Sequence, residues 1–148
     1  MTGARAERFV VLNLRLLAAS FAIVGILFIA TPDGVLDVVS DFGNWLPLGR
    51  FTRAPETAEQ FWLALGFAYM VVITAIALIA QADLVRYRPL MLALAAGKAA
   101  SSITSLIFFA EDDVFAYLLN GIVDGSLVFA SLLLWSLAGR VGSTAAPP

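Results

Sequence analysis

The chain has 148 residues, of which 61% are hydrophobic and only 14% are charged, and its formal net charge is −2. Soluble domains usually carry about a quarter charged residues, and so short a chain cannot hide this apolar excess in a water-soluble core. The sequence therefore predicts an all-α integral membrane protein, a four-helix bundle with the lipid bilayer as its surroundings. No run of basic residues is present, which argues against nucleic acid as a partner.

Cysteine and histidine are both missing from the sequence. The chain therefore has no disulfide, no thiolate metal site and no dithiol redox pair, and it lacks the usual ligand of haem, copper and zinc. We expect no cofactor, no metal site and no catalytic residue, so an enzyme is less expected than a non-catalytic protein. Eight of the nine basic residues are arginine, and together with the abundant alanine this favours a bacterial source.

Four apolar stretches are each long enough to cross about 30 Å of hydrocarbon, which takes about 20 residues of helix. They predict helices at about residues 9–30, 61–80, 89–110 and 114–138. These form one transmembrane domain over residues 1–141, and a low-complexity, flexible tail is expected at residues 142–148. The first stretch is too long for the apolar region of a cleaved signal peptide.

The basic residues predict how the spans are oriented. Arginines flank the helix ends that share one side in a four-span chain, whereas the opposite short turn, residues 111–113, is acidic. Short cytoplasmic flanks are rich in arginine and lysine, so we expect both termini in the cytoplasm and the protein in the bacterial inner membrane. The arginines that carry this prediction are Arg5, Arg8, Arg86, Arg88 and Arg140.

The one long loop follows the first span and shows a helical pattern. Apolar residues at positions 35, 38 or 39, 42 and 45 recur at helical spacing, and Asp33, Asp37 and Asp41 fall on the other face. We predict a short amphipathic helix over residues 33–44, lying on the outer surface of the membrane. Thr57, with Gln60 three residues later, predicts a capping box at the start of the second span.

The third and fourth spans are joined by so short a turn that they must form an antiparallel hairpin. Small residues follow one face of the third span at four-residue intervals, and the fourth span carries two glycines at the same interval. Small residues let membrane helices approach closely. The predicted packing residues are Gly97, Ser101, Ser105, Gly121 and Gly125, with Ala93 continuing the first series.

Two charges fall near the middle of this hairpin. Counted back from the acidic turn, Lys98 and Asp124 lie at about equal depth, and a lone charge at the bilayer centre is costly. We therefore predict a Lys98–Asp124 ion pair inside the bundle. It can be a structural clamp or a site for a proton, an ion or a ligand, and the sequence leaves both open. Four polar side chains are expected to join it in a buried network: Tyr69, Ser102, Asn120 and Ser20.

The first span has an early Arg15, a central Gly25, a late Phe28 and a closing Pro32 before a long outer loop. In this pattern it resembles the first span of the DoxX-like group of small bacterial four-helix membrane proteins. The resemblance implies a four-span bundle with short later loops. The group is functionally mixed, and some members are subunits of membrane redox complexes, so no residue's role carries over to this chain.

Three classes of function compete. The leading hypothesis is a non-catalytic accessory subunit that stabilises a larger membrane complex, with other membrane proteins or a second copy as its partner. The second is a small transporter or channel for protons, ions or a solute that uses Lys98 and Asp124, although no proline interrupts a span. The third is a membrane enzyme acting on a quinone or a lipid, whose only carboxylates near the outer interface lie in solvated loops.

Overall fold

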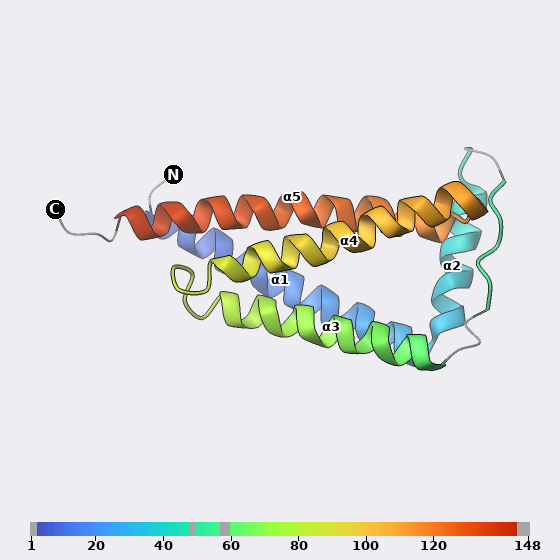
Figure 1. The fold of residues 1–148 in the computed structure, drawn as a ribbon, viewed down its shortest axis with the longest axis horizontal. Helices are drawn as coiled ribbons and strands as arrows, with labels where there is room; N and C mark the ends of the chain where they lie inside the picture. The colour runs from blue at the N-terminus through green and yellow to red at the C-terminus, as the bar shows by residue number, and fades with distance from the viewer. Residues whose placement is uncertain (1–2, 48–49, 57–59, 145–148) are drawn as a thin grey trace.

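The structure, a computed structural model, describes residues 3–47, 50–56 and 60–144. This part of the chain forms five helices: α1 (Gly3–Ala30), α2 (Pro32–Trp45), α3 (Gln60–Ala80), α4 (Pro89–Asp112) and α5 (Phe115–Thr144). Four of them, α1, α3, α4 and α5, are long and apolar enough to cross a membrane (Figure 1). The predicted all-α membrane bundle is therefore confirmed.

The helices extend further than the apolar stretches that predicted them. α1 begins at Gly3, before the first apolar run, and α5 continues to Thr144. Residues 142–144, expected at the start of a flexible tail, are thus helical. Residues 145–148 of that tail and Thr57 of the predicted capping box lie outside the described residues.

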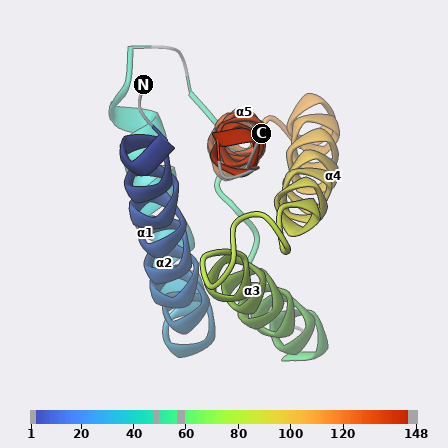
Figure 2. The same ribbon diagram turned by 90° about the vertical axis from the view of Figure 1, so that its left-hand side faces the viewer.

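The four long helices are arranged in a ring, seen end-on in Figure 2. α1 packs against α3 and α5, and α4 packs against the same two helices. Apolar side chains from all four fill the ring in two clusters. One cluster joins Val10, Leu14, Ala80, Leu84, Met91, Leu134 and Ala138, and the other joins Phe21, Met70, Ile73 and Leu94.

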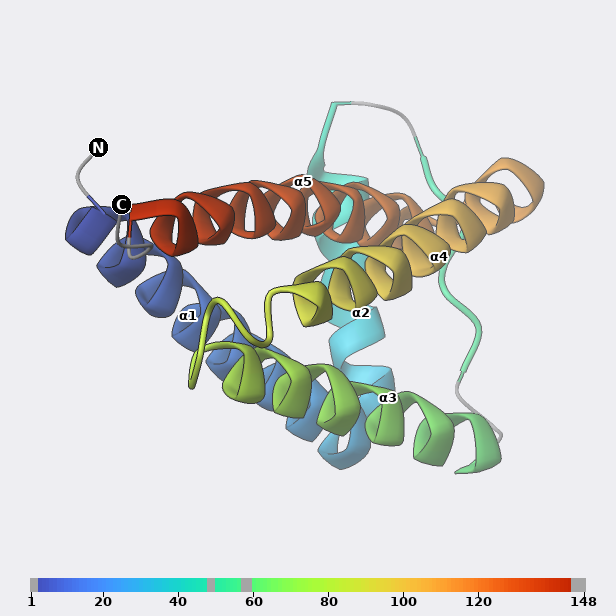
Figure 3. The same cartoon turned by 60° about the vertical axis from the view of Figure 1, so that its left-hand side comes forward.

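The two ends of the bundle differ. The N-terminus, the C-terminal end of α5 and the α3–α4 loop lie at one end, which we call the inner end (Figures 1 and 3). α2 lies across the opposite, outer end, beside the α4–α5 turn. The α1–α3 pair and the α4–α5 pair diverge toward the outer end in both views. This geometry agrees with the four-span order expected from the sequence.

α2 has three faces, where the sequence indicated only two. Its acidic face carries Asp33, Asp37 and Asp41 as predicted, and all three are exposed. A second face is buried against the bundle at Ser40 and Gly43. An added Cβ at Gly43 would overlap the ring of Phe115, so only glycine fits this contact between α2 and α5.

The third face of α2 is apolar and exposed. It consists of Val38, Phe42 and Trp45, and Trp45 is 77% exposed. The rings of Phe42 and Trp45 stack with their centroids 6.1 Å apart. The predicted helix is therefore present, and its apolar residues are divided between the bundle and the surroundings. Its position on a membrane surface stays a prediction.

The α4–α5 turn is built around one residue in a left-handed conformation. Asp113 has φ 54°, and its backbone N–H donates to the Phe109 carbonyl 2.9 Å away, which closes α4. Aspartate tolerates this conformation better than most residues. The Asp113 carbonyl accepts a hydrogen bond from the Thr52 N–H at 3.0 Å. The turn that aligns Lys98 with Asp124 is thus tied to the segment that follows α2.

Candidate functional site

Lys98 of α4 and Asp124 of α5 form the predicted ion pair in the bundle interior. The Lys98 Nζ atom lies 2.9 Å from Asp124 Oδ1, and the two side chains are only 5% and 6% exposed. The pair forms because the short turn at Asp113 fixes the register of the hairpin, which brings the two positions to the same level. The two opposite charges compensate each other where water cannot.

The Lys98 ammonium also lies near two aromatic rings. Its Nζ atom is 4.8 Å from the centroid of the Phe21 ring on α1 and 5.6 Å from that of the Tyr69 ring on α3. An ammonium is attracted to the face of an aromatic ring, and more strongly where both are desolvated. Side chains of all four long helices therefore meet around one positive charge.

Tyr69 belongs to this cluster, although not through the hydrogen bond that the sequence suggested. Its hydroxyl is buried and has no hydrogen-bond partner among the described residues. The hydroxyl oxygen lies against Gly97, only 3.2 Å from where a Cβ would be. Tyr69 thus contributes its ring to the lysine, and Gly97 provides space for the hydroxyl. Gly97 packs against α3 here, whereas the sequence placed it in the α4–α5 interface.

Ser102 lies one turn from Lys98 and holds the hairpin together without touching the ion pair. Its hydroxyl donates to the backbone carbonyl of Gly121 at 2.7 Å. The two predicted glycines of α5 lie beside it. A Cβ at Gly125 would be 3.1 Å from the Ser102 hydroxyl, and one at Gly121 would meet the side chain of Leu106. Gly121 and Gly125 are therefore close-packing positions, as predicted.

Asn120 does not join the buried network, and this expectation is wrong. Its Nδ2 donates to Ser105 Oγ at 2.8 Å and to Ser101 Oγ at 3.3 Å, and the residue is exposed. Ser20 is exposed too, and its hydroxyl bonds to the Leu17 carbonyl of its own helix. Neither side chain is therefore buried with the ion pair.

Aromatic and arginine contacts that the sequence did not indicate hold the inner end of the bundle. The Arg88 guanidinium lies 4.1 Å from the Trp135 ring centroid, and its Nε donates to the Trp135 carbonyl at 2.9 Å. Arg15 Nε donates to Gln81 Oε1 at 3.0 Å, just beyond the end of α3. The sequence places Arg88 directly before the predicted third span, but no pattern in it links Arg88 to Trp135.

The outer half of the bundle is open at positions where the inner half is packed. Phe21 of α1 is buried, yet Phe28, two turns further on the same face, is exposed. Ile73 of α3 is buried, yet Gly66, two turns before it, is exposed and has no neighbour within 4 Å of an added Cβ. Asn120 lies one turn before the buried Asp124 and is exposed as well. The chain's own helices thus leave these inward positions uncovered.

The site offers a pair of opposite charges in the bundle interior. Among the residues that the structure describes, no three acidic side chains are grouped closely enough to hold a metal ion. No family model, curated protein or solved structure matches this chain. The geometry of the site is therefore the basis for a functional assignment.

Proposed function

We propose that this protein is a non-catalytic accessory subunit that stabilises a larger complex in the bacterial cytoplasmic membrane, with both termini in the cytoplasm. The observation that carries the proposal is the uncovered outer half of the bundle. Phe28, Gly66 and Asn120 lie on the faces that form the core one or two turns deeper, and all three are exposed in the described part of the chain. A transmembrane helix of another subunit would complete this core.

The exposed polar group at Asn120 supports a protein partner over lipid alone. The Asn120 amide and its two serine partners lie at membrane depth, where lipid chains offer no hydrogen bond. Polar side chains and small residues are the usual contacts between membrane helices. The arginines that flank the spans at the inner end outnumber Arg50 and Arg53 of the outer loop, which supports the proposed orientation.

The ion pair fits a structural role better than a catalytic or transport role. The two charges compensate each other without a ligand, and two aromatic rings enclose the ammonium. A site that binds and releases ions needs access and an unbalanced charge at some stage. We therefore propose that Lys98 and Asp124 clamp the four spans together.

A small transporter is the second candidate, and one observation favours it. The exposed Asn120 is four residues from Asp124, so the uncovered region of the outer half comes within one turn of the ion pair. A solute entering there would meet the amide before it met the charges. The burial of the pair is the reason for ranking this candidate second.

We also propose membership of the DoxX-like group, on the resemblance of the first span. Gly25, the central glycine of that pattern, packs so closely on α3 that a Cβ would come within 2.9 Å of Met70 Cβ. Arg15, the early arginine, contacts the α3–α4 loop through Gln81. Two of the four residues of the pattern thus contact α3 or the loop that follows it.

Cysteine cross-linking tests the proposed subunit role, because the natural chain contains no cysteine. Gly66→Cys and Phe28→Cys, each in its native membrane, should cross-link to one and the same membrane protein, at a constant ratio in mild detergent. Ile122→Cys is the matched control, since Ile122 is exposed on the outward face of α5. Cross-linking from all three positions alike, or from none, would contradict a specific partner in the outer half.

A further inference from the structure

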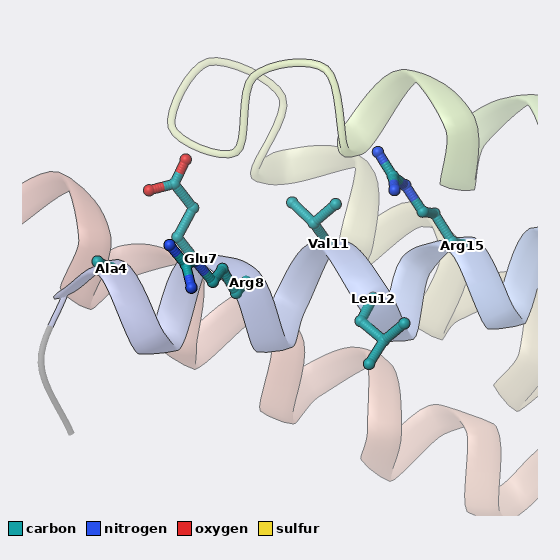
Figure 4. Close-up of a pocket in the computed structure, with 6 residues that line it drawn as sticks. All are labelled: Ala4, Glu7, Arg8, Val11, Leu12 and Arg15. Carbon is teal, nitrogen blue, oxygen red and sulfur yellow. The ribbon is translucent and has the colours of Figure 1, made fainter.

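A hollow of about 410 Å³ lies on the surface of α1 near the inner end of the bundle. Figure 4 shows Arg15 at its deeper end and Arg8 toward the N-terminus, with Val11 and Leu12 between them. The lining residues are Ala4, Glu7, Arg8, Val11, Leu12 and Arg15. The hollow therefore combines two positive charges and one negative charge with apolar side chains, and it is separate from the Lys98–Asp124 site.

The position of Arg15 places the hollow at the membrane boundary. Its Nε atom donates to Gln81 Oε1 at 3.0 Å, and Gln81 directly follows the last residue of α3. A guanidinium carries five N–H donors, so one bond to Gln81 leaves the terminal nitrogens available. Arg8 is exposed, and no hydrogen bond or ion pair of its side chain is found in the described part of the chain. Both groups can bind an anion at headgroup level.

An apolar surface leads from the hollow into the bilayer. Leu12 is exposed in the hollow, and Leu16, one turn deeper on the same face, is exposed too. Ile23 continues this face two turns beyond Leu16 and is also exposed. An acyl chain can therefore lie along α1 below a headgroup held in the hollow.

We propose that this hollow binds an anionic phospholipid, with its phosphate between the guanidinium groups of Arg8 and Arg15 and one acyl chain along Leu12 and Leu16. Arginine binds phosphate oxygens in pairs of parallel hydrogen bonds. The two arginines are separated by about 10 Å along the helix, at about 1.5 Å per residue, so their long side chains can approach one phosphate from both sides. Basic pockets at the cytoplasmic boundary are typical sites for anionic headgroups.

Glu7 gives the proposal a second, opposite test. Its carboxylate also lines the hollow, and Figure 4 shows it on the same side of α1 as the Arg15 guanidinium. A negative charge there repels a phosphate. Glu7→Gln should therefore tighten binding, whereas loss of either arginine should weaken it.

Native mass spectrometry of the purified protein, titrated with phosphatidylglycerol and with phosphatidylcholine of the same chain length, tests the site. Arg8→Gln and Arg15→Gln should each weaken phosphatidylglycerol binding about fivefold, the effect expected for one basic residue near an anionic surface, and leave phosphatidylcholine binding unchanged. Arg5→Gln is the matched control, because Arg5 is exposed on the same helix and does not line the hollow.

Three results would overturn the proposal. Equal weakening by Arg5→Gln would mean a diffuse attraction and no site. Displacement of the lipid by millimolar inorganic phosphate would mean a site for a free anion. Unchanged binding in Arg8→Gln would exclude the site even if Arg15→Gln failed to fold, since the Arg8 side chain forms no bond within the described structure. The lipid site is independent of the proposed subunit role, so either can fail without the other.

Discussion

Two ion pairs in this protein have the same length and opposite surroundings. Lys98 and Asp124 lie 2.9 Å apart in the bundle, with side chains 5% and 6% exposed. Arg53 and Asp37 lie 2.9 Å apart at the outer end, with side chains 64% and 57% exposed. Because the distance is the same, any difference between the two pairs in their contribution to the free energy of unfolding must come from their surroundings.

The buried pair is essential because neither charge has an alternative to its partner. Inside the bundle a lone charge cannot be hydrated, and removal of one partner leaves the other uncompensated. At the outer end, water solvates either charge when the other is removed. We therefore expect the contribution of an ion pair to stability to depend on its enclosure by the four spans more than on the distance between its charges.

Arg53 adds no pH dependence near neutrality. A side-chain hydrogen bond to Asp37, followed by the charges of Asp37 and Asp41, raises the pKa of Arg53. A raised pKa means that any contribution to stability is fully present below the ordinary pKa of arginine and is lost only as the pH rises above it. Any contribution of the Arg53 charge should therefore be the same across the whole physiological range.

The largest expected effect comes from removing one of the two charges of the buried pair. Lys98→Met and Asp124→Leu should each lower the free energy of unfolding by about 3–5 kcal/mol, because each leaves a single charge in the core. Thermal unfolding in detergent would measure the loss. A wild-type melting temperature in either variant would show that the remaining charge reaches water, which would break the comparison.

A smaller effect is expected at the outer end from packing. Gly43→Ala should destabilise the docking of α2 by about 1–3 kcal/mol, because the new Cβ would overlap the Phe115 ring. Gly34→Ala on the same helix is the control, since its Cβ would make only an ordinary contact with Thr31. Protease sensitivity of α2 and thermal unfolding report the change. Equal behaviour of the two variants would mean that Phe115 moves aside.

Ser102→Ala should have a smaller effect still. It removes the buried hydrogen bond to the Gly121 carbonyl, and such bonds between membrane helices contribute about 0.6 kcal/mol on average. Ser126→Ala is the matched control, because the Ser126 hydroxyl bonds only to Val123 of its own helix. Chemical unfolding in detergent should separate the two. A larger loss in the control would contradict the account of the hairpin contact.

The smallest effect should come from Arg53→Gln. The guanidinium and its Asp37 partner are both solvated, so we expect no measurable change in thermal unfolding at low or high salt. This is the direct counterpart of the Lys98 variant at the same interatomic distance. A loss as large as that of Ser102→Ala would show that the pair holds the outer end together, contrary to the comparison.

The sequence predicted the buried pair because of two features. Lys98 and Asp124 are the only charges deep in the third and fourth spans, and the short acidic turn fixes their relative depth. Hydropathy likewise predicted the four spans, since about 20 apolar residues in a row match the length of helix that crosses a bilayer. Depth and span length are both properties that can be counted along the chain.

The face of the helix on which each residue lies could not be found by counting along the chain. Asn120 and Ser20 were expected to be buried with the ion pair, but both are exposed: Asn120 donates to serines of α4, and Ser20 donates to a carbonyl of its own helix. Gly97 was assigned to the α4–α5 interface and packs on Tyr69 of α3. In water, apolar periodicity marks the buried face of a helix, but in lipid both faces are apolar and this signal is lost. The faces became known only from the packing.

The buried face of α2 was missed for a related reason. The sequence shows an acidic side and an apolar side, and Ser40 and Gly43 belong to neither. Gly43 is buried because of the Phe115 ring, a contact with a residue 72 positions further along the chain. A contact between residues so far apart in the chain leaves no pattern in the sequence around either of them.

A double-mutant cycle at Lys98 and Asp124 tests the central claim, that the pair clamps the four spans, most directly. Lys98→Met, Asp124→Leu and the double variant would be compared by thermal unfolding in detergent and by recovery of the cross-linked complex. The account predicts that the double variant recovers most of the stability lost in each single variant and still assembles, because no charge is left alone. Strictly additive losses would contradict it, and a stable double variant that cannot assemble would move the pair from structure to function.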